Sequence, residues 1–270
     1  AGIKCADKVN TVSPTYMKEL LYNANGLEDL FEYEKGKCSG IINGIDFEVW
    51  NPETDPLISN NFNIDKISDK QKNKKKLCKD FGFDIKLPLI IFIGRLVGEK
   101  AADLLPDAIS RAFESINKNF NFLILGSGEK SIEYQLKEMN EKWFDYYNSR
   151  FEYNEQLSHQ MYAAADFLLM PSRVEPCGLN QLYALRYGTI PIVRRTGGLN
   201  DTVIDIGDDG FGICFNHASV DDIIYSIKRA LDLFENTNMV NSIRKKMMRI
   251  NNSWEHSAQN YIDLYHSIYR

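Results

Sequence analysis

The sequence is short of cysteine and contains no long apolar run. Its five cysteines, an odd number, form no CxxC pair and no zinc-binding spacing, which favours a reducing, cytosol-like compartment over a disulfide framework. No stretch of about 18 apolar residues is present, so we expect no membrane-spanning segment and no membrane partner. The first residues, AGIKCADKVN, also lack the apolar core of a signal peptide.

An excess of positive charge is absent as well. The chain has 32 Lys and Arg against 37 Asp and Glu, a formal net charge of −5. Because a general nucleic-acid binder needs a basic surface, this balance argues against a nucleic-acid partner. The four histidines form no HExxH pattern or ligand cluster, so we expect no metal site and treat each histidine as structural or solvated. With 44% hydrophobic residues, the 270 residues suffice for one large α/β domain or two unequal ones.

From residue 87 onward, short apolar runs alternate with helix-like segments. The runs are LPLIIFIG, NFLILGSG, RFEYN, DFLLMPS and TIPIVRRTGG, and segments such as AADLLPDAISRAFESI lie between them. Runs that are apolar throughout are typical of strands buried on both faces, so the alternation predicts the α/β class, with a Rossmann-like parallel sheet covered by helices on both faces. Ligands of such sheets bind beyond the carboxyl ends of the strands. The residues after each run are therefore the first candidates for a site.

Two segments lie outside this alternation of apolar runs and helix-like segments, and we predict their structures separately. Residues 60–80 are polar and rich in lysine, which favours a solvated helix face over a polyanion-binding patch. The last helix-like stretch, SWEHSAQNYIDLYHSIY, has aromatic residues at helical spacing. We expect these aromatics to pack in the core or in an interface.

The loops after three of the runs offer candidate groups. GRLVGEK places Arg95 and Lys100 across a glycine-containing bend, where they could converge on a diphosphate or remain a pair of surface cations. Tyr153, in RFEYNEQL, is positioned to stack on a base or to be half-buried. LGSGEKS suggests a phosphate loop, but Glu129 and Ser131 stand where the known fingerprints require glycine. We expect a glycine turn beside a sugar-nucleotide pocket, with its lysine solvated.

The stretch PSRVEPCGLNQLYALRYG, residues 171–188, joins a predicted buried strand to a predicted helix. If the helix begins near Gly178, the free N–H groups of Gly178, Leu179 and Asn180 point into the crevice and attract phosphate. Glu175 then lies just before this end, where it could bind sugar hydroxyls, stabilise positive charge at an anomeric carbon, or simply cap the helix. Cys177 has no histidine beside it, so we expect a pocket-lining residue and not a nucleophile.

The same stretch, extended to PSRVEPCGLNQLYALRYGTIPIVRRTGGLNDTV, resembles the donor-site signature of bacterial glycogen synthases and plant starch synthases. ADKVNTVSPTYMKELL, SGIINGIDFEVWNPETDP and SWEHSAQNYIDLY resemble the same family. Its members are retaining glycosyltransferases of the GT-B fold. The resemblance implies transfer of glucose from ADP-glucose to the non-reducing end of an α-1,4-glucan, with ADP as product and no cofactor. It implies a cytoplasmic enzyme, or a plastid one in a plant.

The resemblance also implies roles for residues that match the family motifs. Arg95 and Lys100 match the cations that bind the donor pyrophosphate, and Glu175 matches the essential glutamate at the donor glucose. Tyr153 matches the aromatic residue that stacks on adenine. Further matching positions in the donor site are Asn43 near the sugar, the backbone of Cys177, Gly178 and Leu179, and Asn180 next to the phosphate.

Three departures from the family pattern qualify this expectation. Ala101 stands where the family usually has Gly, and Asn180 where it usually has Thr. The third is that the acceptor-side KxGG motif does not occur in the 270 residues. We therefore expect the C-terminal, nucleotide-sugar half of such an enzyme. Residues 1–42 would be a remnant of the N-terminal acceptor domain and hinge, and residues 43–270 the donor-binding domain.

If this division holds, the partner of the chain is the missing N-terminal domain, and the chain alone is inactive or weakly active. Two alternatives stay open at this point. One is a GT-B transferase that uses a UDP-sugar, and the other is a non-catalytic nucleotide-binding module that has kept the fold.

Overall fold

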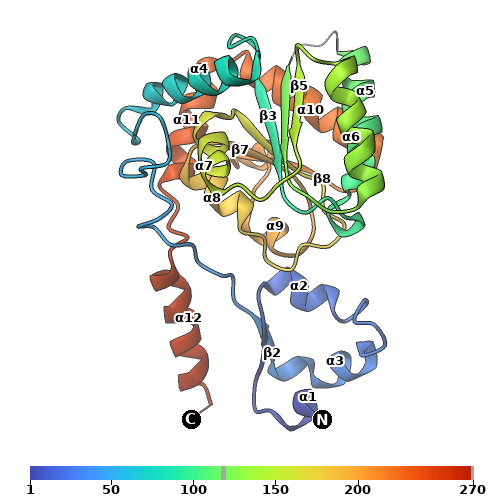
Figure 1. The fold of residues 1–270 in the computed structure, drawn as a ribbon. Coiled ribbons are helices and arrows are strands. Elements are labelled where there is room, and N and C mark those ends of the chain that lie inside the picture. The colour runs from blue at the N-terminus through green and yellow to red at the C-terminus, as the bar shows by residue number, and fades with distance from the viewer. Residues whose placement is uncertain (117–119, 269–270) are drawn as a thin grey trace.

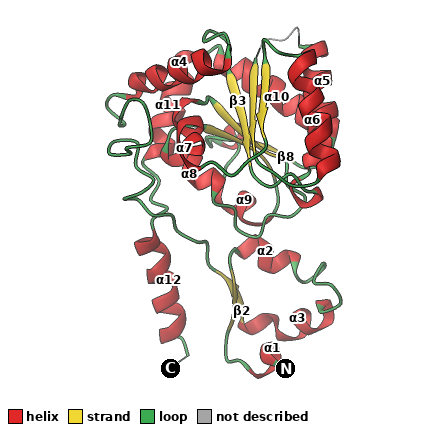
Figure 2. Cartoon of the chain, in the orientation of Figure 1, coloured by secondary structure: helices red, strands yellow, loops and turns green. Residues whose placement is uncertain are grey.

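The body of the molecule is a six-stranded parallel sheet (Figures 1 and 2). The computed structural model describes residues 1–116 and 120–268. The strand order is β5-β4-β3-β6-β7-β8, so the chain reverses its direction of progress between the neighbours β3 and β6. The strands are β3 (Leu89–Ile93), β4 (Asn121–Leu125), β5 (Tyr147–Arg150), β6 (Phe167–Met170), β7 (Ile190–Arg194) and β8 (Ile213–Phe215). This order confirms the predicted Rossmann-like sheet, and its reversal point is where such sheets bind ligands.

Helices cover both faces of the sheet (Figure 1). On one face lie α5 (Leu105–Ser115), α6 (Lys130–Lys142) and α10 (Val220–Phe234). On the other lie α4 (Lys70–Phe81), α7 (Glu155–Ala164), α8 (Asn180–Arg186) and α11 (Thr237–Met248). One continuous apolar core joins the sheet to both layers, because the central strands are buried on both sides. Short 3₁₀ helices occupy Lys35–Lys37, Ile67–Asp69, Gly98–Lys100, Ala102–Leu104 and Ile206–Asp208.

Strand β5 differs from the expectation. RFEYN was predicted to be a strand, but β5 ends at Arg150, and the residues after it form the following loop. β5 is an edge strand whose one partner within the described residues is β4, and its side chains alternate between buried and accessible positions. An edge strand needs no continuous apolar run, and therefore the apolar-run criterion places it too late in the sequence.

Helix α4 also differs from the expectation, because two of its lysines are buried and not solvated. The Lys70 ammonium donates to the carbonyls of Tyr162, Ala163 and Tyr187 at 2.9–3.1 Å. Burial lowers the pKa of Lys70 well below its usual value. Lys74 forms a buried ion pair with Asp166 at 2.7 Å. These lysines tie α4 to the core, so only the outer lysines of the segment belong to a solvated face.

A smaller unit lies below the sheet and contains both ends of the described chain (Figure 1). It comprises β1 (Val9–Thr11) paired with β2 (Cys38–Gly40), the helices α1 (Gly2–Cys5), α2 (Pro14–Glu19) and α3 (Glu28–Glu34), and, beside them, α12 (Trp254–His266). Its own apolar cluster has three buried members, Met17, Ala24 and Phe31. The predicted domain division after residue 42 stays a prediction.

The unit is attached to the body through α9 (Gly197–Thr202). Glu19 accepts hydrogen bonds from the Gly197 amide at 2.8 Å and the Thr196 hydroxyl at 3.0 Å. In α12, however, Ser257 is the one buried residue among those described. The aromatic residues of α12 are therefore not core residues of this chain, and the expectation of an interface stays open.

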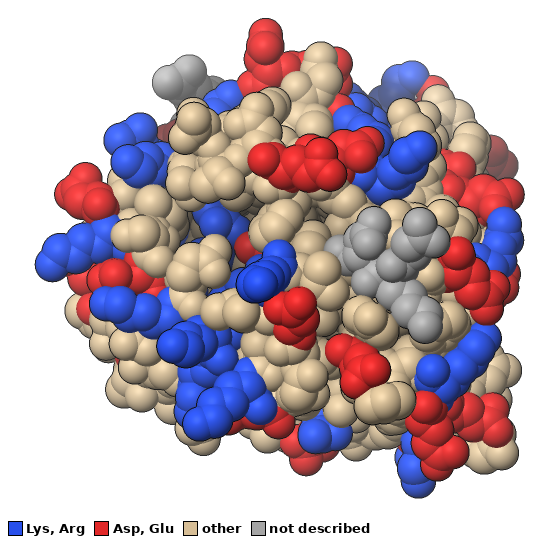
Figure 3. All heavy atoms as spheres, turned by 90° about the horizontal axis from the view of Figure 1, so that it is seen from above, with Lys and Arg blue, Asp and Glu red and all other residues tan. Residues whose placement is uncertain are grey.

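Two further properties of the described residues bear on function. No helix among them is both long enough and apolar enough to cross a membrane. On the face seen from above, Lys and Arg are interspersed with Asp and Glu (Figure 3).

Candidate functional site

Two adjoining cavities open beyond the carboxyl end of β3, one toward the end of β6 and the other toward the end of β4. The first, here called the charged cavity, has a volume of about 220 Å³ and is lined by Arg95, Lys100 and Glu175 among others. The second, here called the aromatic cavity, has a volume of about 340 Å³ and is lined by Tyr153 among others. The two share the residues Ile93, Gly94, Arg95 and Asn180. The reversal point of the sheet thus brings together side chains from loops that are far apart in the sequence.

In the charged cavity, Lys100 and Glu175 form a close ion pair. The Lys100 ammonium lies 2.7 Å from Oε1 and 2.6 Å from Oε2 of Glu175. The Glu175 side chain is 7% exposed and that of Lys100 is 22% exposed. The buried hydroxyl of Ser172 donates a third hydrogen bond to the carboxylate, at 2.9 Å. Glu175 is therefore held in one orientation by donors from two loops.

Arg173 holds these two loops against each other, and Arg194 ties the loop that contains Glu175 to β7. Arg173 donates to the Gly98 carbonyl at 2.6 Å and forms a two-pronged pair with Asp103 at 2.5 and 2.8 Å. The hydrogen bond from Arg173 lowers the pKa of Asp103. Arg194 donates to the carbonyls of Ser172 and Arg173 at 2.7 and 2.6 Å. Planar guanidinium groups suit such multiple contacts, and that of Arg173 holds the loop of Lys100 beside the loop of Glu175.

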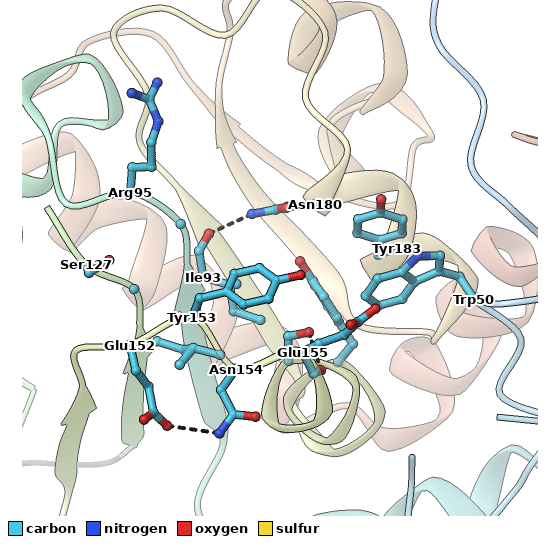
Figure 4. Close-up of a pocket in the computed structure, with 15 residues that line it drawn as sticks. Trp50, Ile93, Arg95, Ser127, Glu152, Tyr153, Asn154, Glu155, Asn180 and Tyr183 are labelled. Atoms are coloured by element: carbon cyan, nitrogen blue, oxygen red, sulfur yellow. Dashed lines mark hydrogen bonds between the residues drawn. The ribbon is translucent and has the colours of Figure 1, made fainter. Parts of the chain in front are cut away.

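Arg95, at the junction of the two cavities, is much more open. It is 67% exposed and pairs with Glu99, which is 64% exposed, at 3.1 Å. Its guanidinium extends away from the ring of Tyr153 (Figure 4). Arg95 and Lys100 both line the charged cavity, with Lys100 the more buried of the two, and their convergence on a diphosphate stays a prediction.

Glycines let the loops after β3 and β4 pack closely. A Cβ atom on Gly126 would lie 1.8 Å from the Gly94 carbonyl oxygen, and one on Gly128 would lie 2.3 Å from that of Leu96. Ser127, between them, lines the aromatic cavity, and Lys130 is 89% exposed. These positions confirm that LGSGEKS is a glycine turn beside the pocket, with its lysine solvated.

The segment between Glu175 and α8 reaches the charged cavity at Leu179, whereas Cys177 and Gly178 are not among the residues that line it. Gly178 has a φ of 73°, and α8 begins at Asn180, two residues later than expected and only seven residues long. The amide of Asn180 donates to the Ile93 carbonyl at 2.6 Å, so this side chain links α8 to the end of β3. Leu179 and Asn180 line the charged cavity.

Asn43 and Cys177 contact each other outside the two cavities. The backbone N–H of Asn43 donates to the Cys177 sulfur at 3.4 Å. Asn43 lines a third cavity, of about 560 Å³, together with residues at the start of α12, and it does not line the two cavities described above. Burial raises the pKa of the Cys177 thiol, which suits a packing residue better than a nucleophile.

Ala101 departs from the usual backbone conformation. It is fully buried and has a φ of 53°, in the left-handed region that favours glycine. It directly follows Lys100, so the local strain lies in the loop that carries this cation.

In the aromatic cavity, the ring of Tyr153 lies across the middle, with Arg95 at one end and Trp50 and Tyr183 at the other (Figure 4). Tyr153 is 89% exposed, which leaves its ring free to stack on a planar ligand. The indole of Trp50 is stacked between Tyr183 and His159, with ring centroids 3.8 Å apart on each side.

Trp50 is held from behind by a buried network. Asp55 accepts from the ring of His159 at 2.8 Å and from the hydroxyl of Tyr187 at 2.5 Å. His159 is therefore a structural histidine, as expected. Among the residues that the structure describes, no group of three potential ligands could hold a metal ion.

The sequence analysis did not identify several residues that support the two cavities. Trp50 and Tyr183 lie 133 positions apart, so no local spacing could have paired them. Arg173 and Arg194 act through contacts with backbone carbonyls, and these contacts have no signature in the sequence. The sequence could, however, have suggested Ser172, because it follows a predicted buried strand.

The chain is similar to glycosyltransferases over nearly its whole length. Residues 73–247 match the family described as glycosyl transferases group 1, and residues 1–33 match the starch synthase catalytic domain. The chain is 53% identical over 268 residues to a glycogen synthase of Flavobacterium johnsoniae, covering 99% of this chain and 57% of that protein. It is 40% identical to a glycogen synthase of Thermodesulfovibrio yellowstonii, covering 99% of this chain and 53% of that protein.

A solved structure is similar over the same range. The catalytic domain of starch synthase IV from Arabidopsis thaliana, bound to ADP and acarbose, matches with a TM-score of 0.91 and 36% identity. The match covers 99% of this chain and 57% of that one. The chain thus spans about half the length of the curated relatives it matches.

Proposed function

Since the chain belongs to the glycosyl transferases group 1 family and has the Rossmann-like fold of a GT-B donor domain, we propose that it is the nucleotide-sugar half of a glucosyltransferase of the glycogen synthase type. The proposed donor is ADP-glucose and the proposed acceptor is the non-reducing end of an α-1,4-glucan. One observation supports the proposal most directly. Lys100 and Glu175 both line a cavity at the reversal point of the sheet, and the exposed ring of Tyr153 lines the adjoining cavity.

The two cavities accommodate different parts of this donor. In the proposal, Arg95 and Lys100 bind the diphosphate, because both line the charged cavity and cations at a strand end attract phosphate. Glu175 lies at the glucose, and the backbone at Cys177, Gly178 and Leu179 closes that end. Adenine stacks on Tyr153 in the aromatic cavity. Asn180 lies between the two parts, because its side chain lines both cavities.

The proposed reaction breaks the bond between glucose C1 and the diphosphate and forms a bond from C1 to the acceptor O4. The configuration at C1 is retained, and the acceptor hydroxyl loses its proton. Arg95 and Lys100 neutralise the charge that develops on the leaving diphosphate. The Glu175 carboxylate orients the glucose and stabilises positive charge at C1. The two cations supply the neutralising charge, so the proposal requires no metal and no organic cofactor.

We assign acceptor binding to a further domain, because the relatives are nearly twice as long as this chain. We propose that the further domain docks on the exposed surface of the smaller unit. This unit has only three buried apolar residues of its own, yet it exposes Tyr22 and Tyr33 by 84% and 81% and Tyr265 of α12 by 57%. Exposed aromatics of this kind mark interfaces. We therefore expect the chain alone to bind the donor and to elongate glucan slowly or not at all.

Calorimetric titration of the chain with ADP, ADP-glucose and UDP-glucose tests the proposal. We expect binding that prefers adenine and that is lost in the Arg95→Ala/Lys100→Ala double variant. A preference for UDP-glucose would instead identify a UDP-sugar transferase. If none of the three binds, the donor-site proposal is wrong, and a non-catalytic role of the fold becomes the better account.

A further inference from the structure

The Lys100 ammonium is already occupied by a carboxylate in this structure. An ammonium group has three N–H donors, and Lys100 directs them at both oxygens of Glu175, at 2.7 and 2.6 Å. The carboxylate is 7% exposed, so the pair is only weakly screened by water. A diphosphate that binds to Lys100 must therefore compete with a strong, partly desolvated partner.

We propose, building on the donor site proposed above, that Glu175 has a second role as the counter-ion that holds Lys100 and thereby weakens the binding of a nucleoside diphosphate. Ser172 supports this role, because its hydroxyl fixes the carboxylate beside Lys100 from the other side at 2.9 Å. The bonds of Arg173 to the Gly98 carbonyl and to Asp103 keep the two loops at the distance that the pair requires.

The pair gives the donor and the product different affinities. When ADP-glucose is bound, the glucose hydroxyls occupy Glu175, and Lys100 is shared with the diphosphate. Once the glucosyl group has left, nothing but Lys100 and Ser172 satisfies the carboxylate. Glu175 then draws Lys100 back, and ADP is bound less tightly than two nearby cations would otherwise bind it. The same residue that orients the sugar thus favours release of the product.

The chain offers a matched control in the pair Arg95–Glu99. This pair also joins a cation of the site to a glutamate, at 3.1 Å, but both side chains are more than 60% exposed. Exposed pairs are screened by solvent and contribute little. Neutralising Glu99 should therefore affect ADP binding much less than neutralising Glu175.

The test is titration of ADP and ADP-glucose into the chain and its Glu175→Gln variant, which keeps the shape of the side chain. We expect Glu175→Gln to bind ADP about tenfold more tightly, the effect of one charge-assisted hydrogen bond. The preference for ADP-glucose over ADP should fall by at least about tenfold, because the sugar loses its carboxylate. Glu99→Gln should change ADP affinity by less than about threefold. Thermal unfolding checks that the variants are folded.

The Lys100→Ala background separates the counter-ion role from simple repulsion between Glu175 and the diphosphate. In that background, Glu175→Gln should no longer tighten ADP binding, because Lys100, the cation that Glu175 holds, is absent. A gain that persists without Lys100 would overturn the counter-ion role. So would a wild-type chain that binds ADP and a Glu175→Gln variant that binds it no more tightly. A wild-type chain that binds no ADP overturns the donor site itself, and the counter-ion role with it.

Discussion

The charged and the aromatic cavities share one wall but are built in opposite ways. In the charged cavity, Glu175 is 7% exposed, and side-chain bonds to backbone carbonyls lock the loops around it. In the aromatic cavity, Tyr153 is 89% exposed, and the Asp55 network behind Trp50 supports only its far wall. The difference shows that charges must be held at fixed distances to be effective, whereas a ring can stack on a base over a range of positions.

The largest effect is expected at the charged cavity, on removal of its buried cation. Lys100→Ala should weaken ADP binding by about 100-fold, because a charge-assisted contact with the diphosphate is lost. Calorimetric titration measures the change. Lys100→Arg serves as the control, since it keeps the charge and should retain part of the affinity. A loss of less than about threefold in Lys100→Ala would remove the distinction between the two cavities.

At the aromatic cavity the expected effect is smaller. Tyr153→Ala should weaken ADP binding by about tenfold, because base stacking on an aromatic ring is lost. Tyr153→Phe keeps the ring and should bind ADP within about twofold of the wild type. Titration with ribose 5-phosphate, which has no base, should give the same affinity in all three proteins. If Tyr153→Ala binds ADP normally, the base lies elsewhere.

The strained residue beside Lys100 gives a prediction on stability. Ala101 has a φ of 53° and is fully buried, so Ala101→Gly should relieve strain and raise the free energy of unfolding by about 1 kcal/mol. Urea unfolding measures this change. Ala108→Gly is the matched control, because Ala108 lies inside α5 and the same substitution there should destabilise the protein by about 1 kcal/mol. Destabilisation of the protein by Ala101→Gly would mean that this loop is not strained.

The smallest effect is expected on the exposed side of the junction. Glu99→Ala should tighten ADP binding by less than about threefold in low salt, because it frees Arg95 from a solvent-screened partner. The gain should disappear at about 0.5 M salt, where screening removes interactions between exposed charges. Titrations at the two salt concentrations measure both values. A gain as large as that expected for Glu175→Gln would show that burial does not distinguish the two ion pairs.

The sequence predicted those parts of this site that lie directly after buried strands. Arg95 and Glu175 could be placed because the strand sequences LIIFI and FLLM are apolar throughout, and the sheet topology brings the ends of these strands together. β5 was misplaced, because an edge strand has no continuous apolar run. The buried position of Lys70 was missed, because its partners are carbonyls of distant segments. Local patterns therefore predict the strand ends, while contacts between distant loops become visible only in the folded chain.

A crystal structure of the chain with ADP tests the central claim most directly. We predict that the diphosphate lies within hydrogen-bonding distance of Arg95 and Lys100, that adenine stacks on Tyr153, and that Lys100 has left at least one oxygen of Glu175. ADP bound outside the two cavities would contradict the account. So would ADP bound between them while Lys100 still bridges both oxygens of Glu175.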